Sequence, residues 1–386
     1  MDEQPVYLDF AASTPVDPAV WDLMREVSAT TCANASSTHA GGRLAQSIIA
    51  GAAERLAGLL NTQPRNLIWT SGATESDNLA ILGGARHRAH LGRHVVTMRT
   101  EHKAVTDAFD RLAREGFEVT WLDPGSNGVL DPQLLAAALR DDTQLASIMF
   151  VNNETGVIQD IETLGGLCRE RGVLFHVDAA QAAGKVRVDL AALPVDLMSL
   201  TAHKFYGPKG IGALYIADRP GCHVDPMLFG GGQQRRIRPG TLPTELIAGL
   251  GKAAEIAAGR IDRDLAHLQA LHDQMWSGIA DLGGVVRNGD AGGFPGILNV
   301  SAAGLEGESL LLALEPLQVA TGSACNSKSQ EPSYVLRALG RSDAEAQSAI
   351  RFSFGRPTTG REVGFAAGRY RDAVTRLRRL APGRAA

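Results

Sequence analysis

Residues 173–181 of this chain, "VLFHVDAAQ", decide its fold class. The run from Val173 to Val177 is almost continuously apolar, which is typical of a strand in a sheet covered on both faces. Asp178 ends this run, and Gln181 follows three residues later. A buried carboxylate is costly unless a cation meets it, although a helix cap or a buried ion pair would also explain this one. The stretch predicts a strand of an α/β sheet that carries polar groups at its carboxyl end.

Six other segments between residues 66 and 218 have the same apolar character and are bounded by turn residues. Helical patterns lie between the early ones, over residues 73–88 and 102–114, and Gly116 closes the second. This alternation predicts a mainly parallel, seven-stranded sheet with right-handed crossovers. The other six expected strands are "NLIWTS" (66–71), "HVVTMRT" (94–100), "EVTWLD" (118–123), "LASIMFVNN" (145–153), "DLMSLTA" (196–202) and "GALYIAD" (212–218).

The regular alternation of strand-like and helical segments ends after Gly240. A helical region over residues 243–282 is followed by the glycine-rich "NGDAGGFPG", the strand-like "ILNVSA" and a helix near residues 308–314. A short strand, "LQVA", and a closing helix complete the chain. We therefore expect a large domain over residues 16–260, and a smaller α+β domain formed by residues 1–15 and 261–386.

Composition limits the classes of function. The chain has 386 residues, 44% of them apolar, and a formal net charge of -4, which indicates neither a nucleic-acid nor a membrane partner. The acidic start, "MDEQPVYLDF", lacks the features of a secretory signal. Cys32, Cys168, Cys222 and Cys325 are widely spaced and match no metal-site pattern. We expect a reduced, cytoplasmic compartment and no bound metal.

Polar groups occur at three predicted strand ends, where ligands of open α/β sheets bind. Gly72 to Thr74 open a helix whose N–H groups suit a phosphate, although an ordinary helix cap fits equally well. Asp178 could hold a protonated ring nitrogen. Lys204 could form a Schiff base, although a lysine in such a place is often a solvated loop residue. Together they indicate a site for pyridoxal phosphate.

One cysteine lies in a polar setting. Cys325 sits in "TGSACNSKSQEPSYV", residues 321–335, among polar residues and three positions before Lys328. Free cysteines are usually small buried hydrophobes, but a thiol in a polar loop near a cation can form a reactive thiolate. Cys325 is therefore a candidate nucleophile.

Motifs along nearly the whole chain resemble those of group I cysteine desulfurases of the NifS/IscS type, within the class V aminotransferase-like family. The resemblance implies a fold type I, pyridoxal-phosphate-dependent enzyme. The motifs are "YLDFAASTPVDP", "SGATESDNLAI", "TEHKAV", "VNNETGV", "FHVDAAQAAGK", "HKFYGPKGIGALY", "GTLP", "GSACNSKSQEPSYVLRALG" and "IRFSFGRPTT".

The resemblance implies a role for each matching residue. Lys204 corresponds to the lysine that binds the cofactor covalently, His102 to a histidine stacked on its ring, and Cys325 to the nucleophile. The substrate-binding positions correspond to Asn34, Asn153 and Arg351, the last of which grips the substrate carboxylate. The cofactor-binding positions correspond to Ala73, Thr74, His102, Asn153, Asp178, Gln181, Thr201, His203, Lys204 and Thr241. In the family the residue at Thr241 reaches the neighbouring subunit's phosphate, which implies a homodimer.

The implied reaction converts L-cysteine to L-alanine and leaves the sulfur on Cys325 as a persulfide. The persulfide sulfur would then pass to an acceptor protein, which could be an iron–sulfur scaffold, a tRNA-thiolation protein or a DNA-phosphorothioation protein. The sequence departs from the family pattern in "ANASS" (33–37) and in "GGGQQRRIRPGT" (230–241). We also expect this chain to meet its acceptor without the tail that housekeeping members use to dock the scaffold.

Two other functions are compatible with parts of the pattern. A selenocysteine lyase or an aminotransferase would use the same cofactor, although Cys325 argues against the aminotransferase, which needs no thiol. A catalytically silent partner of a sulfur acceptor would bind without turnover, and the presence of Lys204, Asp178 and Cys325 argues against it.

Overall fold

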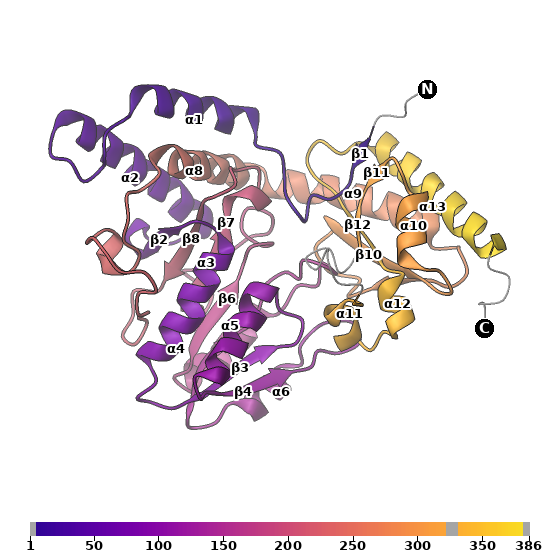
Figure 1. The fold of residues 1–386 in the computed structure, drawn as a ribbon, viewed down its shortest axis with the longest axis horizontal. Helices are drawn as coiled ribbons and strands as arrows, with labels where there is room; N and C mark the ends of the chain where they lie inside the picture. The colour runs from indigo at the N-terminus through magenta and orange to yellow at the C-terminus, as the bar shows by residue number, and fades with distance from the viewer. Residues whose placement is uncertain (1–4, 322–330, 381–386) are drawn as a thin grey trace.

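The computed structural model describes residues 5–321 and 331–380. Within these residues the larger sheet has seven strands in the order β2-β8-β7-β6-β5-β3-β4 (Figure 1). All neighbouring strands run parallel except β8, which is antiparallel to both β2 and β7. The prediction of a mainly parallel, seven-stranded sheet is confirmed. The strands are β2 (Leu67–Thr70), β3 (His94–Met98), β4 (Glu118–Leu122), β5 (Thr143–Ser147), β6 (Leu174–Asp178), β7 (Leu197–Thr201) and β8 (Gly212–Ile216).

Both faces of this sheet are covered, as the apolar strands predict. Successive residues of one strand pack into different cores: Leu174 joins one cluster of buried side chains and Phe175 the other. The Leu174 side is covered by the chain from α3 (Ala73–Asn78) through the π turn Leu79–Gly83 to α4 (Gly84–His87), and by α5 (Lys103–Arg114). The Phe175 side is covered by α2 (Ala40–Leu60), α6 (Pro132–Ala138), α7 (Ile161–Glu170) and α8 (Thr244–Ala258). Helix α1 (Pro18–Thr30) packs on α8.

A second, antiparallel sheet has the order β12-β13-β10-β9 within the described residues. It packs with α9 (Ile261–Ile279), α10 (Gly307–Ala313) and α13 (Gly360–Leu380), which lie on the C-terminal side of the molecule (Figure 1). The helical region expected over 243–282 is thus two helices, α8 and α9. The remaining elements are β1 (Val6–Tyr7), β9 (Val285–Asn288), β10 (Ile297–Ala302), β11 (Leu317–Gln318), β12 (Ala320–Thr321), β13 (Ile350–Ser353), α11 (Tyr334–Ala338) and α12 (Asp343–Gln347).

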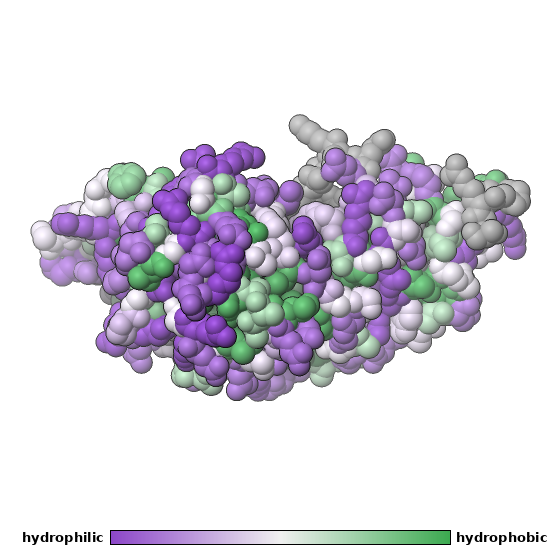
Figure 2. All heavy atoms as spheres, turned by 90° about the horizontal axis from the view of Figure 1, so that it is seen from below, coloured by the Kyte–Doolittle hydropathy of each residue, from purple (hydrophilic) through white to green (hydrophobic). Residues whose placement is uncertain are grey.

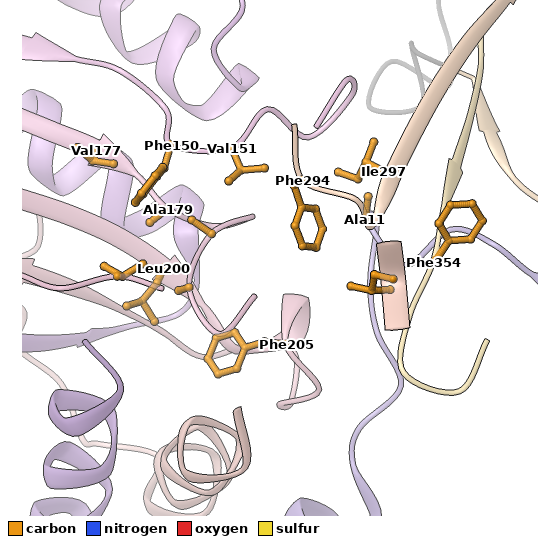
Figure 3. Packing of buried hydrophobic residues seen from close by; sticks show 14 of the residues in the cluster. Ala11, Phe150, Val151, Val177, Ala179, Leu200, Phe205, Phe294, Ile297 and Phe354 are labelled. Carbon is orange, nitrogen blue, oxygen red and sulfur yellow. The ribbon is translucent and has the colours of Figure 1, made fainter. Parts of the chain in front are cut away.

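The N-terminal segment belongs to the smaller unit by its pairing. Strand β1 pairs with β11, and Asp9 forms a bridge with Ser353 of β13. Residues after it then cross toward the large sheet, and Ala11 lies beside Ile297 and Phe354 of the smaller unit (Figure 3), in a cluster of buried side chains that also includes residues of the large sheet. In that figure Phe294 and Phe354 come from the smaller unit and Phe205 from the larger one. One continuous core therefore holds the ends of β6 and β7 against the second sheet.

The outer surface is mixed in character. Figure 2 shows hydrophilic residues over much of one face, with apolar residues in smaller groups among them. Among the described residues, no helix combines the length and apolar character that crossing a membrane requires.

Candidate active site

A cavity of about 490 Å³ lies at the carboxyl ends of the parallel strands. It is bounded by the turn after β2, the ends of β6 and β7, the start of α5 and the N-terminal segment. This is the position at which open α/β sheets bind their ligands. Ten of the residues singled out in the sequence line it: Ala73, Thr74, His102, Asn153, Asp178, Gln181, Thr201, His203, Lys204 and Arg351.

Three singled-out residues are not among the lining residues. Cys325 lies outside the described residues. Asn34 and Thr241 are exposed and lie close to each other, with Asn34 Nδ2 3.5 Å from Thr241 Oγ1. The two segments that carry them are 207 positions apart in the chain. The structure therefore brings them together, but not into the cavity of their own chain.

One end of the cavity suits a phosphate. Gly72 precedes α3 with a φ of +155° and offers no capping side chain, so the first N–H groups of the helix adjoin the cavity that Ala73 and Thr74 line. Unsatisfied N–H groups and the positive end of the helix dipole favour an anion. Burial, with the positive charges of Lys204, Lys185 and Lys209, lowers the pKa of His203 to about 4. His203 is thus a neutral hydrogen-bonding group at this end.

The lining of the cavity also includes a buried carboxyl group. Asp178 is 3% exposed, and its Oδ1 accepts the N–H of Ala180 at 2.8 Å. Burial raises its pKa, whereas His102 and Lys204 act in the opposite direction. A carboxylate in such a place is stabilised by a cationic N–H partner, which a protonated pyridine ring supplies. The residues that line the cavity therefore fit both the phosphate and the ring nitrogen of pyridoxal phosphate.

Lys204 also lines the cavity. It ends the short 3₁₀ turn Ala202–Lys204 that follows β7. Its Nζ donates to the carbonyl oxygens of Ala11 and Ala12, at 2.6 and 2.8 Å. Gln181 Nε2 donates to the same Ala11 oxygen at 2.7 Å. The N-terminal segment thus holds Lys204 and Gln181 side by side, a contact that no local pattern in the sequence indicated.

His102 caps α5, and its Nδ1 accepts the Ala104 N–H at 3.1 Å. Burial lowers the pKa of His102; the positive charge of Lys204 adds to this, and the negative charge of Asp178 opposes it. The ring is therefore neutral near neutral pH. Because Nδ1 accepts a backbone hydrogen bond, the proton of the neutral ring resides on Nε2.

Arg351 lies on β13 and is 4% exposed. Its Nη1 donates to the Asn153 carbonyl at 2.8 Å, and its Nη2 donates to Asp9 Oδ1 at 2.7 Å. The guanidinium group is thus fixed by both units of the chain. Asp9 was missed in the sequence, although it lies in the N-terminal motif "YLDFAASTPVDP" that carries the resemblance. The available signal was that an acidic residue in a recognised motif is a candidate partner for the arginine expected to bind the substrate carboxylate.

Buried acidic residues behind the cavity were also missed. Glu101 and Asp77 are fully buried, and burial raises the pKa of both well above its usual range. Glu154 accepts from Ser333 Oγ at 2.6 Å, and burial raises its pKa to about 7. All three residues lie within the recognised motifs "SGATESDNLAI", "TEHKAV" and "VNNETGV", but residue type alone does not reveal their burial.

The departure "GGGQQRRIRPGT" has a structural role. Gln234 Oε1 accepts the Trp69 N–H at 2.5 Å, and Gln234 Nε2 donates to the Trp69 carbonyl at 2.8 Å. Strand β2 is an edge of the sheet, so this side chain satisfies backbone groups that would otherwise be unpaired. The neighbouring Gln233 accepts the Gly240 N–H at 3.0 Å.

Comparisons with known proteins agree with this site. Residues 6–364 match the family model of class-V aminotransferases. The chain is 52% identical to "Cysteine desulfurase IscS" of Methylococcus capsulatus over 380 residues, covering 98% of this chain and 94% of that protein. It is also 52% identical to the protein of that name from Vibrio vulnificus over 382 residues, covering 98% of this chain and 95% of the other.

Solved structures give the same result. A NifS-like protein superposes with a TM-score of 0.90 at 33% identity, covering 97% of this chain and all (100%) of the other. DndA from Streptomyces lividans superposes with a TM-score of 0.78 at 38% identity, covering 91% and 99% of the two chains. The chain therefore belongs to the class-V aminotransferase family and, within it, to the pyridoxal-phosphate-dependent cysteine desulfurases.

Proposed function

We propose that the chain converts L-cysteine to L-alanine in this cavity and passes the sulfur to Cys325. The observation that carries the proposal is the convergence of Lys204, Asp178, the α3 start and Arg351 on one cavity. In the overall step the C–S bond of the substrate breaks and an S–S bond to Cys325 forms. The sulfur is oxidised to the persulfide level, and the carbon is reduced and gains the proton that the thiols release.

The chain would hold pyridoxal phosphate by four kinds of contact. Lys204 would bind it covalently, Asp178 would pair with its ring nitrogen, and Gln181 would donate to its ring hydroxyl. Its phosphate would lie at the start of α3 with Thr201 and His203. When bound, the cofactor supplies an electron sink for bonds that break at the substrate α-carbon.

Arg351 would bind the substrate carboxylate. A guanidinium group has five N–H groups, and Asn153 and Asp9 each accept one of them. The remaining N–H groups can pair with a carboxylate in charge-assisted hydrogen bonds. Since both protein contacts are short and at least partly buried, the fork is oriented before the substrate arrives.

His102 would transfer protons. Its neutral ring holds a proton on Nε2, while Nδ1 is occupied by the backbone of α5. It can therefore donate to a developing negative charge and recover the proton from the substrate thiol or amine. This role depends on the lowered pKa that burial gives the ring.

We also propose a homodimer, a cytoplasmic location and a protein acceptor for the sulfur. Asn34 and Thr241 lie together outside the cavity of their own chain, which supports a role in a neighbouring subunit's site. Free thiols at Cys32, Cys168 and Cys222 support a reduced compartment. The acceptor would be an iron–sulfur scaffold, a tRNA-thiolation protein or a DNA-phosphorothioation protein.

The test is a single incubation with L-cysteine and a thiol reductant. We expect equal amounts of L-alanine and sulfide, and mass spectrometry without reductant should find one added sulfur on the Cys325 peptide. Selenocysteine as a parallel substrate and a keto acid as amino acceptor separate the lyase and aminotransferase alternatives. Turnover of selenocysteine alone, or of amino groups alone, would overturn the proposal.

A further inference from the structure

Lys185 lies behind the cavity and contacts one of the expected cofactor ligands. Its Nζ is 2.5 Å from Gln181 Oε1. The two residues are four positions apart on the turns that follow β6, a spacing that brings side chains together on a helical turn. Here Lys185 N–H donates to the Ala182 carbonyl.

The backbone of this segment is closely constrained. Gly184 has a φ of +72°, and a Cβ atom placed there would lie 2.7 Å from Cγ of the Phe205 ring. Only glycine permits this approach, which brings the Lys185 segment against the residue that follows Lys204. The positions of Gln181, Lys185 and Lys204 are therefore coupled by packing as well as by hydrogen bonds.

Two partners, Lys185 and the Ala11 carbonyl, bear on which way the Gln181 carboxamide faces. An amide has one accepting oxygen and one donating nitrogen. The oxygen receives the Lys185 donor, and the nitrogen donates to the Ala11 carbonyl at 2.7 Å. Rotation of the amide by half a turn would set its oxygen against the Ala11 oxygen. With Lys185 in place, the second N–H of Gln181 Nε2 is kept for the cavity.

Other features identify Lys185 as more than a surface lysine. It lines a small cavity of about 30 Å³ that Lys204, Phe294 and Arg356 also line. Its Nζ lies 5.7 Å from the centroid of the Phe294 ring. Burial, with the positive charges of Lys204 and Arg351, lowers its pKa well below the usual range. Either protonation state of the amine can donate to the Gln181 oxygen.

We propose that Lys185 is a positioning residue that fixes the Gln181 carboxamide with its N–H group toward the cofactor's ring oxygen. The inference rests on the proposed function, because it assumes that the cofactor occupies the cavity in the expected orientation. Lys185 would act through Gln181 and would touch neither substrate nor cofactor.

The test is a pH titration of the absorption spectrum of the cofactor-loaded protein. Without the Lys185 donor only the Ala11 carbonyl, among the described residues, orients the amide. The Gln181 N–H group is then held less firmly toward the cavity, so the ring oxygen accepts a weaker hydrogen bond and holds the neighbouring proton more tightly. For Lys185→Met we expect the spectral midpoint to rise by about half to one pH unit, the effect of one hydrogen bond. Lys185→Arg retains a donor, so its spectral midpoint should stay close to that of the wild type. Lys252→Met, at a partly exposed lysine of α8 that pairs with Glu255, should leave the midpoint unchanged.

A double-mutant cycle identifies the route of the effect. If Lys185 acts through Gln181, Lys185→Met should shift the midpoint in the wild-type background and add nothing in the Gln181→Ala background. Equal shifts in both backgrounds, or a lower melting temperature with no spectral shift, would overturn the inference. Absence of alanine formation in the wild type would refute the proposed function, whereas the spectral cycle would still report on the positioning role.

Discussion

Replacement of Arg351 tests the carboxylate site most directly. Its guanidinium group is 4% exposed and donates to Asn153 and Asp9 at 2.8 and 2.7 Å. A charged hydrogen bond is worth about 1.5–3 kcal/mol, and about 1.4 kcal/mol corresponds to tenfold in affinity. Arg351→Ala should therefore raise the KM for L-cysteine by about ten- to a hundredfold. Arg351→Lys keeps the charge without the planar fork, so its KM should lie between those of the wild type and Arg351→Ala.

The assay is alanine formation over a range of L-cysteine concentrations, with cofactor affinity measured in parallel from the absorption spectrum. Removal of Arg351 also leaves Asp9 without its cation, so the melting temperature of each variant is required. Asp9→Asn provides the matched control: it keeps an oxygen within reach of Nη2, and KM should change by less than about threefold. An unchanged KM in Arg351→Ala, with cofactor binding intact, would place the carboxylate site elsewhere and refute the reasoning.

Three further predictions concern the lysine, the thiol and a buried acid. Lys204→Ala should abolish the visible band of covalently bound cofactor and all alanine formation, because the covalent bond to the cofactor needs its amine; retained turnover would remove Lys204 from this role. Cys325→Ser should keep the cofactor spectrum and its response to L-cysteine but form no persulfide, and mass spectrometry that finds the added sulfur on Cys32, Cys168 or Cys222 would contradict the assignment. Burial raises the folded-state pKa of Glu154 to about 7. Between about pH 4.5 and pH 7 the folded state therefore holds a proton that the unfolded state has lost. The resulting stabilisation, up to about 3 kcal/mol, is fully present below the unfolded pKa and is lost as the pH rises to about 7. Denaturant unfolding at several pH values should show this decline in wild type and a flatter profile in Glu154→Gln, and identical profiles would contradict the raised pKa.

Sequence alone determined the large sheet and the chemistry at its edge. Strand periodicity is a local property, and a buried parallel strand requires a near-continuous apolar run such as residues 173–177. Parallel strands place their carboxyl ends at one edge, so the positions of Asp178 and Lys204 at two strand ends were enough to predict that they lie near each other. The alternation of helix and strand was likewise readable from the chain.

Only the tertiary structure decided how the N-terminal segment completes the site. Asp9 pairs with Arg351 across 342 positions, and the carbonyls of Ala11 and Ala12 hold Lys204 across 193 and 192 positions. These contacts form because β1 joins the smaller unit and the following residues are packed between the two units. Hydrogen bonds and ion pairs of this kind depend on where folded surfaces meet. No local sequence pattern encodes which distant residues come into contact. The raised pKa of Glu154 likewise comes from burial, which packing alone determines.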